Sequence, residues 1–181
     1  MCFVDFKKAF DAISHDKLWV TMMDIGYPLH LIDLLAKLHR QQHAKVKVAG
    51  TLSEWFRVEK VKKGFRHGCV LSPYLFIILA EMVMRETLDG FLGGLQIGAR
   101  IVTNLRYAYD IILLDTSEAE LQQLVDRLDQ TESAVNTAYI LINVDNTKLM
   151  ESDGIACRIL IPNEQLEQVN AFPYLGSLSD Y

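Results

Sequence analysis

The stretch NLRYAYDIILLD, residues 104–115, sets one acidic residue between an aromatic segment and an apolar run. Tyr107 and Tyr109 precede Asp110, and four aliphatic residues follow it. Extended apolar residues on both sides of a short break predict two β-strands joined by a tight turn. The pattern therefore predicts a carboxylate held at the tip of a hairpin, where the second strand begins.

Length and composition limit the class of protein. At 181 residues, half of them hydrophobic, the chain is expected to form one globular domain, residues 1–181, rather than a disordered region. Cys2, Cys69 and Cys157 share no metal-ligand spacing, and their odd number favours reduced thiols in an intracellular compartment, nuclear or cytoplasmic. We expect no signal peptide. We also expect no membrane span, because the longest run without an acid or a base, residues 68–80, is too short.

Charge is unevenly distributed along the chain. The net charge is −5, which by itself does not indicate a nucleic-acid-binding protein. Residues 40–66, however, hold eight Lys or Arg against two Glu, whereas residues 110–181 hold three against thirteen Asp or Glu. The basic segment either binds phosphates or is the solvated face of a hairpin, and the charge pattern supports both equally.

Hydrophobic periodicity predicts short strands between helices. Residues 44–50 and 54–61 alternate between apolar and polar positions on either side of Gly50, which indicates a hairpin. Residues 95–102 and 105–114 are expected to form a strand pair. Shorter strands are expected in CFVDF (2–6), ILINV (140–144), TKLME (147–151), CRILI (157–161) and FPYLG (172–176).

Four segments have helical character. A helix running to Asp24 has Ser14 and Asp16 as candidate N-caps. Ser72 is expected to cap a buried helix with Pro73 at its first position. Two more helices are indicated by apolar stripes, namely Leu31, Leu34, Leu35 and Leu38 in residues 29–41, and Leu121, Leu124, Val125 and Leu128 in residues 118–136. The interleaving of strands, hairpins and helices favours an α+β fold, a sheet with helices packed on one face.

Asp5 lies inside the apolar segment 2–6, where burying a carboxylate costs several kcal/mol unless something compensates for it. An ion pair with Lys7 or Lys8, a position in water at the end of the strand, or a metal ion would each do so. Asp110 poses the same problem in a second strand. Two acids at the tips of neighbouring strands would suit Mg²⁺, which binds carboxylates together with waters and substrate phosphates. Paired Mg²⁺ ions at such a site promote nucleotidyl transfer.

Five segments resemble, in order, the palm motifs of reverse transcriptases encoded by non-LTR (long interspersed element type) retrotransposons. They are FVDFKKAFD (3–11), GFRHGCVLSPYLF (64–76), LRYAYDIILL (105–114), INVDNTK (142–148) and FPYLGS (172–177). The resemblance implies a polymerase palm-like antiparallel sheet, with residues 1–181 forming a partial reverse transcriptase domain. In that family the palm binds two Mg²⁺ ions and extends a DNA primer on an RNA template, using deoxynucleoside triphosphates and no membrane.

The resemblance assigns roles to individual residues. Asp5 and Asp110 would be catalytic metal ligands, with the backbone carbonyl of Phe6 as a companion ligand. Phe10 would block a ribose 2′-hydroxyl and so select deoxynucleotides, and Lys148 would protonate the leaving pyrophosphate. Arg66, His67 and Gly68, in the loop 64–73, would contact the nucleotide and template. Tyr107 and Tyr109 would lie in the turn beside the substrate. Tyr174, Leu175 and Gly176 match the hairpin that grips the primer end.

Each of these matches also has an ordinary structural explanation. Phe10, Phe172 and Tyr174 are typical core aromatics, residues 72–73 suit a helix start, and Lys148 resembles many exposed lysines. The ordered set of motifs, rather than any one of them, favours the functional explanation.

The turn departs from the family pattern, Tyr-Ala-Asp-Asp, at one position. Tyr109 occupies the place of the first aspartate, which bridges both metals, so Asp110 matches only the second acid. A phenol, with a pKa of about 10, is neutral at pH 7 and is a poor Mg²⁺ ligand. Two lesser departures are His67, in place of a glutamine, and Asn146, in place of a lysine. We therefore expect a degenerate active site with weakened Mg²⁺ binding and impaired catalysis.

The matched motifs start and end with the palm, so we expect the fingers and thumb to be largely absent from residues 1–181. Three functions stay open. The first is an active reverse transcriptase palm. The second is a palm without catalysis that binds RNA or DNA through its basic hairpin, and the third is a protein-interaction module. The degenerate turn favours the second over the first, and the sequence does not separate the second from the third.

Overall fold

A computed structural model of the chain describes residues 1–7, 13–40, 43–57, 64, 69–108, 110–134, 141–151, 155–161 and 163–180, without the side chains of 132–134 and 177–180. The described helices are α1 (His15–Asp24), α2 (Leu29–Arg40), α3 (Leu71–Leu88) and α4 (Glu118–Ala134). The strands are β1 (Cys2–Val4), β2 (Phe6–Lys7), β3 (His43–Ala44), β4 (Lys47–Val48), β5 (Thr51–Leu52), β6 (Phe56–Arg57), β7 (Leu95–Ile97), β8 (Arg100–Val102), β9 (Asn104–Tyr107), β10 (Asp110–Leu113), β11 (Leu141–Ile142), β12 (Lys148–Leu149), β13 (Leu160–Ile161), β14 (Glu164–Gln165), β15 (Glu167–Gln168), β16 (Ala171–Tyr174) and β17 (Ser177–Asp180).

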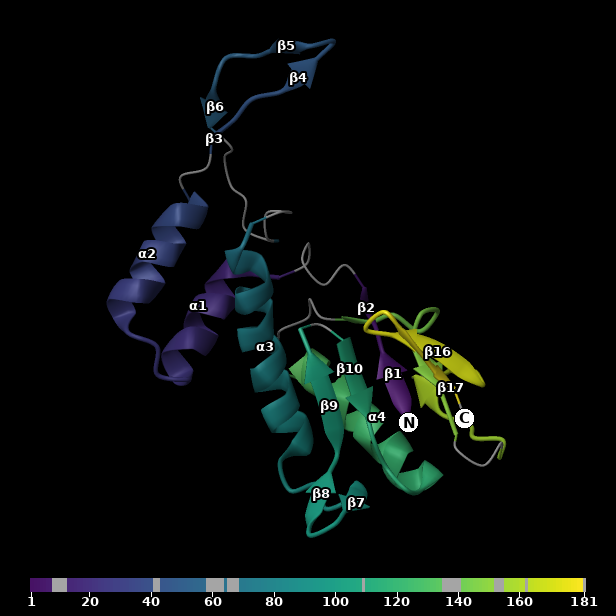
Figure 1. Cartoon of the computed structure of the whole chain (residues 1–181). Helices are drawn as coiled ribbons and strands as arrows, with labels where there is room; N and C mark the ends of the chain where they lie inside the picture. The colour runs from purple at the N-terminus through teal and green to yellow at the C-terminus, as the bar shows by residue number, and fades with distance from the viewer. Residues whose placement is uncertain are drawn as a thin grey trace.

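The main sheet of the described residues joins distant parts of the chain in the order β15-β12-β1-β10-β9 (Figure 1). Its strand pairs are antiparallel except β12 with β15. The other strands form two-stranded pairs. The chain is therefore a mixed α+β protein built from helices and small antiparallel sheets, as the pattern of the sequence predicts.

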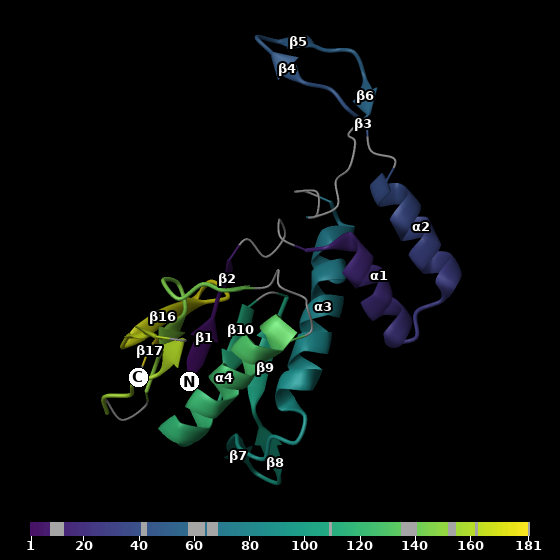
Figure 2. The same cartoon turned by 180° about the vertical axis from the view of Figure 1, so that it is seen from behind.

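The two faces of the main sheet bury different partners. Side chains alternate between the faces of a strand, and the residues divide accordingly into two clusters. The cluster on the helix side includes Cys2, Val4, Ile111 and Leu113 with α3 and α4 residues such as Val83, Met84, Leu124 and Leu128. The cluster on the other side contains Phe3, Ile112, Leu114 and Met150, packed against Phe172 and Tyr174 of β16. Helix α4 and the β16–β17 hairpin thus cover opposite faces (Figures 1 and 2).

The hairpin expected in residues 104–115 is confirmed. Strands β9 and β10 pair antiparallel, with Tyr107 opposite Asp110. Ala108 in the turn has a positive φ of 55°, a conformation typical of tight hairpin turns. The carboxylate of Asp110 therefore stands at the start of β10.

Helix α4 buries the predicted stripe Leu121, Leu124, Val125 and Leu128, and α1 begins after Ser14, one of its two candidate caps. The side chain of Ser14 makes no capping hydrogen bond.

The predicted apolar face of α2 is confirmed for Leu35, which is buried, and Leu31, which packs against the core, but it is wrong for Leu34 and Leu38. Leu34 and Leu38 are 62% and 54% exposed, whereas the buried face consists of Ile32, Leu35, Ala36 and His39. Helix α2 packs on α1, so the face that meets α1 decides which residues are buried. The start of α3 is also corrected, because the helix begins at Leu71 and Ser72 lies in its first turn instead of capping it.

The hairpin predicted in residues 44–50 and 54–61 is confirmed as far as residue 57, and residues 58–61 lie outside the described residues. Strand β3 pairs with β6 and β4 with β5, about a turn in which Ala49 and Gly50 both have positive φ, 48° and 85°. Residues 95–102, expected to pair with 105–114, instead form a hairpin of their own, β7–β8, and β9 pairs with β10. The glycine at 98 (φ 63°) makes this local turn possible.

The three cysteines are free thiols, and burial raises the pKa of Cys2 to about 12. No described helix combines the length and the apolar character needed to cross a membrane.

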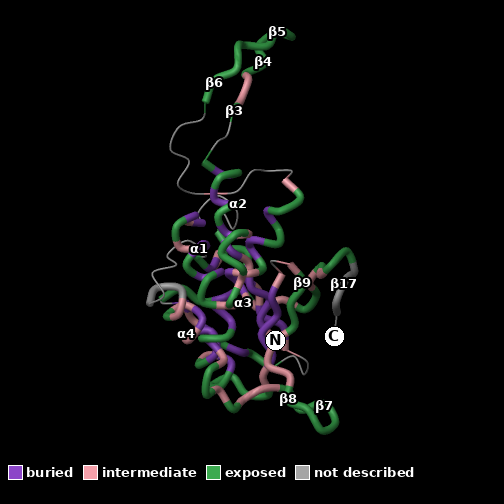
Figure 3. Tube along the Cα trace, turned by 90° about the vertical axis from the view of Figure 1, so that its left-hand side faces the viewer, coloured by how far each residue is buried: buried purple, intermediate pink, exposed green. Residues whose placement is uncertain are grey.

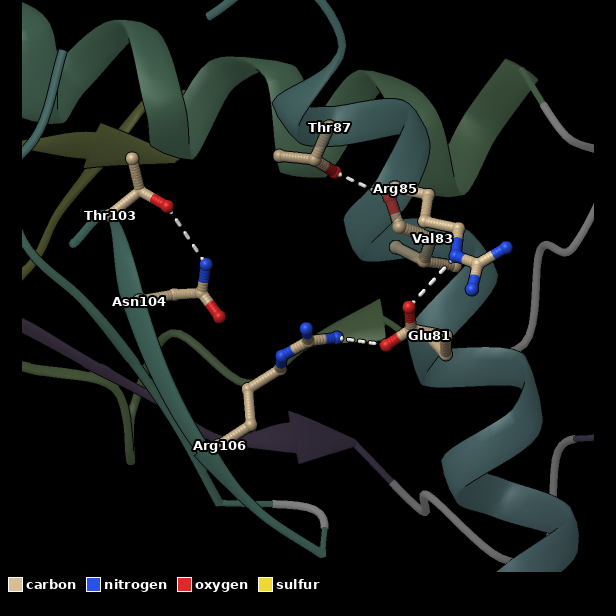
Figure 4. A network of polar contacts seen from close by, with 7 residues as sticks. All are labelled: Glu81, Val83, Arg85, Thr87, Thr103, Asn104 and Arg106. Atoms are coloured by element: carbon tan, nitrogen blue, oxygen red, sulfur yellow. Dashed lines mark hydrogen bonds and ion pairs between the residues drawn. The ribbon is translucent and has the colours of Figure 1, made fainter. Parts of the chain in front are cut away.

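A charged network connects α3 to the edge of the main sheet (Figure 4). Glu81 of α3 accepts hydrogen bonds from Arg85 Nε at 2.8 Å and from Arg106 Nη1 of β9 at 2.6 Å. The Arg85 hydrogen bond, followed by the charge of Arg106, lowers the pKa of Glu81 below its ordinary 4.5. The ionised form of Glu81 is therefore favoured by folding.

We predict that Glu81→Gln lowers the free energy of unfolding by about 0.5–1 kcal/mol at pH 7, since the pair is partly exposed. A lowered folded-state pKa stabilises the protein above the unfolded value and loses that effect as the pH falls below 4.5. Urea unfolding across pH 3–7 should show the difference between parent and variant shrinking in acid. Glu86→Gln, on an exposed position of the same helix, should change little; equal effects of the two variants would contradict the network.

Candidate functional site

The register of β1 and β10 brings two acids to one edge of the sheet. Val4 lies opposite Ile111, Asp5 follows Val4, and Asp110 precedes Ile111. Because side chains alternate, Asp5 shares the face of Phe3, which is the face covered by β16 and β17. Both acids line a pocket of about 310 Å³, whose other lining residues are Phe3, Val4, Ile111, Asn146, Lys148, Phe172 and Tyr174.

Asp5 is held by the turn that connects β11 to β12. Its carboxylate Oδ2 accepts hydrogen bonds from the side-chain amides of Asn143 at 2.8 Å and Asn146 at 2.9 Å. Its backbone is held as well, since its N–H donates to Thr147 Oγ1 at 3.1 Å and its carbonyl accepts from Asn143 N at 2.8 Å. Four hydrogen bonds therefore hold Asp5 to residues that lie more than a hundred positions later in the sequence.

The pKa values of two residues in the pocket, Asp110 and Tyr174, are raised. Burial, followed by the negative charge of Asp5, raises the pKa of the Asp110 carboxyl. Burial, followed by the charge of Asp110, also raises the pKa of the Tyr174 phenol. These shifts agree with the shared pocket in placing Asp5, Asp110 and Tyr174 near one another.

Aromatic rings form one wall of the pocket. The Phe3 ring lies 4.5 Å from that of Phe172 and 5.7 Å from that of Tyr174, measured between centroids. This stacking attaches the β16–β17 hairpin to the main sheet and keeps it beside the acids.

Lys148 reaches the pocket from β12, directly opposite Phe3 in the register. Its ammonium donates to Glu167 Oε2 at 2.7 Å and to the carbonyl of Asp145. Glu167 lies opposite Lys148 in the parallel pair of β12 and β15. The positive charge of Lys148 is thus paired with Glu167 rather than with either acid of the pocket.

The other predicted site residues are divided between core and surface. Phe6 is buried, with its ring 6.2 Å from Phe76, whereas Tyr107 is 65% exposed. Leu175 and Gly176 form the turn of the β16–β17 hairpin, both with positive φ. Phe10, Arg66, His67, Gly68 and Tyr109 lie outside the described residues.

One described residue of the loop 64–73 is linked to the segment that follows Asp5. Gly64 donates its N–H to the carbonyl of Ile13 at 2.8 Å, and His15 Nε2 donates to the carbonyl of Gly64 at 2.7 Å. The nitrogen that faces the carbonyl must carry the proton. Gly64, at the start of the motif of residues 64–76, is therefore hydrogen-bonded to His15 of α1, the helix that follows the motif of residues 3–11.

Asn143, Thr147 and Glu167 were not among the predicted site residues, and Asn146 was noted only as a departure from the family. Asn143, Asn146 and Thr147 all belong to the INVDNTK segment, so their concentration in one short motif was the available signal. Nothing in the sequence indicated Glu167, because its pairing depends on the parallel register of β12 and β15.

Asp5 and Asp110 together fit a Mg²⁺ site of the sparse kind, in which one or two carboxylates combine with waters and substrate phosphates. Asp5 Oδ1 accepts no hydrogen bond from the described residues. The charge of Asp5, which adds to burial in raising the pKa of Asp110, would be offset by a cation. A denser protein-only site is not formed, since no three His, Cys, Asp or Glu of the described residues converge on a metal position.

Comparison with known proteins decides the family. The model of the family "Reverse transcriptase (RNA-dependent DNA polymerase)" matches residues 1–177. The chain belongs to this family. Its similarity to non-LTR retrotransposon enzymes, predicted from the five motifs, is also confirmed by its curated relatives.

Those relatives are polyproteins of R2 retrotransposable elements from insects. The chain is 28% identical to a Retrovirus-related Pol polyprotein of Nasonia vitripennis, over 70% of the chain, and 28% identical to that of element R2DM in Drosophila melanogaster, over 78%. It is 24% identical to one from Popillia japonica, over 96% of the chain. The matched parts cover 12%, 13% and 29% of these relatives, so the reverse transcriptase chain spans a minor part of their length.

We predict that Thr147→Val lowers the free energy of unfolding by about 1–2 kcal/mol, because Thr147 is fully buried and the variant leaves the Asp5 N–H without its acceptor. Urea unfolding measures the loss. Thr51→Val, on an exposed hairpin position, is the matched control and should change stability by less than about 0.5 kcal/mol. A loss no larger than that of the control would show that the turn does not hold Asp5.

We also predict that Asp5→Asn lowers the pKa of Asp110 while leaving it above its ordinary 3.8, since burial persists when the neighbouring charge is removed. A carboxyl-carbon NMR titration of Asp110 measures the change. Asp145→Asn removes an exposed carboxylate of the turn that does not act on Asp110 and should have no effect. An unchanged pKa of Asp110 in Asp5→Asn would show that the charge of Asp5 does not act on Asp110.

Proposed function

We propose that this chain is the palm of a non-LTR retrotransposon reverse transcriptase and that its polymerase chemistry is impaired at one metal ligand. The observation that supports the proposal most directly is the convergence of Asp5 and Asp110, from separate strands, on one pocket beside the aromatic β16–β17 hairpin. The main antiparallel sheet, with helices on one face, is then the palm sheet. An RNA template, a DNA primer and deoxynucleoside triphosphates are the proposed substrates.

In this proposal the residues of the pocket have distinct tasks. Asp5 and Asp110 hold divalent metal, which when bound stabilises the attacking and leaving oxygens of nucleotidyl transfer. Asn143 and Asn146 orient the Asp5 carboxylate by occupying Oδ2. The backbone of Phe6, whose side chain is anchored in the core, presents its carbonyl next to Asp5.

The remaining roles follow the position of each element. Tyr174, with Leu175 and Gly176 at its hairpin turn, faces the primer end, because Phe3 holds this hairpin against the acids. Lys148 is placed to protonate pyrophosphate at the pocket rim, with Glu167 orienting its ammonium group. Phe10 selects deoxynucleotides, Arg66, His67 and Gly68 contact nucleotide and template, and Tyr107 lines the approach of the substrate.

The impairment rests on Tyr109, which stands in the sequence directly before Asp110 where the family has its bridging aspartate. A neutral phenol there leaves one negative charge fewer for two dications and a triphosphate. Loss of one such ligand costs about 4 kcal/mol of transition-state stabilisation, roughly a thousandfold in rate.

We predict that Tyr109→Asp raises the rate of primer extension on an RNA template by roughly a thousandfold in Mg²⁺, and that it tightens Mn²⁺ binding measured by calorimetry. Tyr109→Asn, which changes the size of the side chain without adding charge, is the control and should gain neither property. Extension by the parent at the rate of Tyr109→Asp would overturn the impairment. Failure of Tyr109→Asp to gain metal affinity would overturn the assignment of position 109 as a ligand.

A further inference from the structure

The hairpin of residues 43–57 has two faces of different chemistry. His43 pairs with Arg57 in β3 and β6, and Lys47 pairs with Leu52 in β4 and β5. The registers of these two ladders differ by one residue, and the extra residue lies between Leu52 and Phe56. No residue is added between His43 and Lys47, so steps of two place Lys45 with them on one face. Trp55 belongs to the same face, because the Lys45 ammonium lies 5.0 Å from the centroid of its ring. The face therefore combines three permanent cations with one indole.

The opposite face of the hairpin is apolar. Ala44 pairs with Phe56, and Val48 pairs with Thr51. Val46 lies between β3 and β4, and its carbonyl accepts a hydrogen bond from Ser53 N at 2.9 Å. The basic face and the apolar face thus alternate along residues 43–48.

The groups on the basic face are accessible. Trp55 is 65% exposed, although indole is among the largest apolar groups a protein can bury. Within the described residues, Lys45, Lys47 and Arg57 form no ion pair. Glu54 is the single acid of residues 43–57. The face thus presents uncompensated positive charge around an exposed ring.

The hairpin also stands apart from the rest of the molecule. Its strands pack chiefly on one another, and it extends beyond the ends of α2 and α3, away from the main sheet and the β16–β17 hairpin (Figures 1 and 3). A ligand on this face would therefore not compete with the pocket of Asp5 and Asp110.

We propose that the basic face of this hairpin, comprising His43, Lys45, Lys47, Trp55 and Arg57, is a binding site for single-stranded nucleic acid outside the polymerase pocket. Lys45 lies between β3 and β4, and Lys47 is the first residue of β4. Two residues of extended chain span about 7 Å, a spacing that lets both side chains reach phosphates of an extended nucleic acid strand. Trp55 supplies a platform on which one unpaired base stacks.

Charge and shape both favour a single strand over other occupants. A base within a duplex has its faces covered by its neighbours, so Trp55 stacks only where bases are unpaired. An acidic protein surface would be attracted to the cations but would leave the ring without a planar partner. Binding at this face does not depend on polymerase activity, because none of its residues belongs to the pocket of the two acids.

The first test measures binding of fluorescent 12-nucleotide RNA and DNA of one sequence, single-stranded and duplex, to the whole chain in EDTA. Trp55→Ala should weaken single-strand binding about five- to 150-fold, the range for loss of one stacked base. Lys45→Ala with Lys47→Ala should reduce the slope of log affinity against log salt by about 1.4, because each phosphate neutralised on a single strand contributes roughly 0.7. The RNA and DNA arms show whether the site prefers one of them.

The second test uses intrinsic fluorescence. Trp19, the other tryptophan, is 7% exposed in the core, whereas Trp55 is exposed, so stacking should quench the Trp55 emission. The quenching should saturate with the binding curve and disappear in Trp55→Phe, while circular dichroism shows an unchanged fold.

Matched controls come from elsewhere on the surface. Arg100→Ala removes an exposed basic side chain from the β7–β8 hairpin, and Val48→Ser changes the apolar face of the hairpin of residues 43–57. Neither should alter affinity or salt slope. Equal binding by the parent and both basic-face variants would overturn the proposal. Duplex binding equal to single-strand binding, or a loss confined to Val48→Ser, would also overturn it, the latter by indicating a protein partner on the apolar face.

Discussion

The contact on which the site depends is the set of four hydrogen bonds between Asp5 and the turn of residues 143–147. Asp5 is a carboxylate at the end of a fully buried strand, where ionisation is expensive without polar partners. Two side-chain amides donate to Oδ2, and Oδ1 accepts no hydrogen bond from the described residues. Because the partners lie about 140 residues away, this contact also closes the sheet, bringing β12 beside β1.

From that contact the rest of the pocket follows by register. Once β1 lies between β10 and β12, the two-residue period puts Phe3, Asp5, Asp110 and Lys148 on the same face. The helices occupy the other face with Cys2, Val4 and Leu113. Phe3 and the other apolar residues on the pocket face pack against β16, whose aromatic rings form one wall of the pocket.

Two separate surfaces of opposite charge emerge from the fold. Asp5 from the start of the chain and Asp110 from its acidic half both line the pocket, where burial, followed by the charge of Asp5, raises the pKa of Asp110. Residues 43–57 form a hairpin that extends away from the main sheet (Figure 3), and the Lys45 ammonium of this hairpin lies over the Trp55 ring. On the two proposals, nucleic acid would bind the hairpin and divalent cations the pocket, and the hairpin lies apart from the main sheet (Figure 1). A palm with weakened polymerase chemistry would then still bind nucleic acid.

The sequence by itself determined the family, through the resemblance of five ordered motifs. It also determined the α+β class, the hairpins at Gly50 and Asp110, and the stripe of α4, because these rest on local periodicity or on turn residues. It did not determine which face of α2 is buried, since that depends on how α2 meets α1, nor that residues 95–102 pair with themselves. Only the tertiary structure placed Asn143 and Asn146 on Asp5, and Glu167 on Lys148. Such pairs join distant strands, and a one-residue change of register would have turned every one of these side chains to the other face of the sheet.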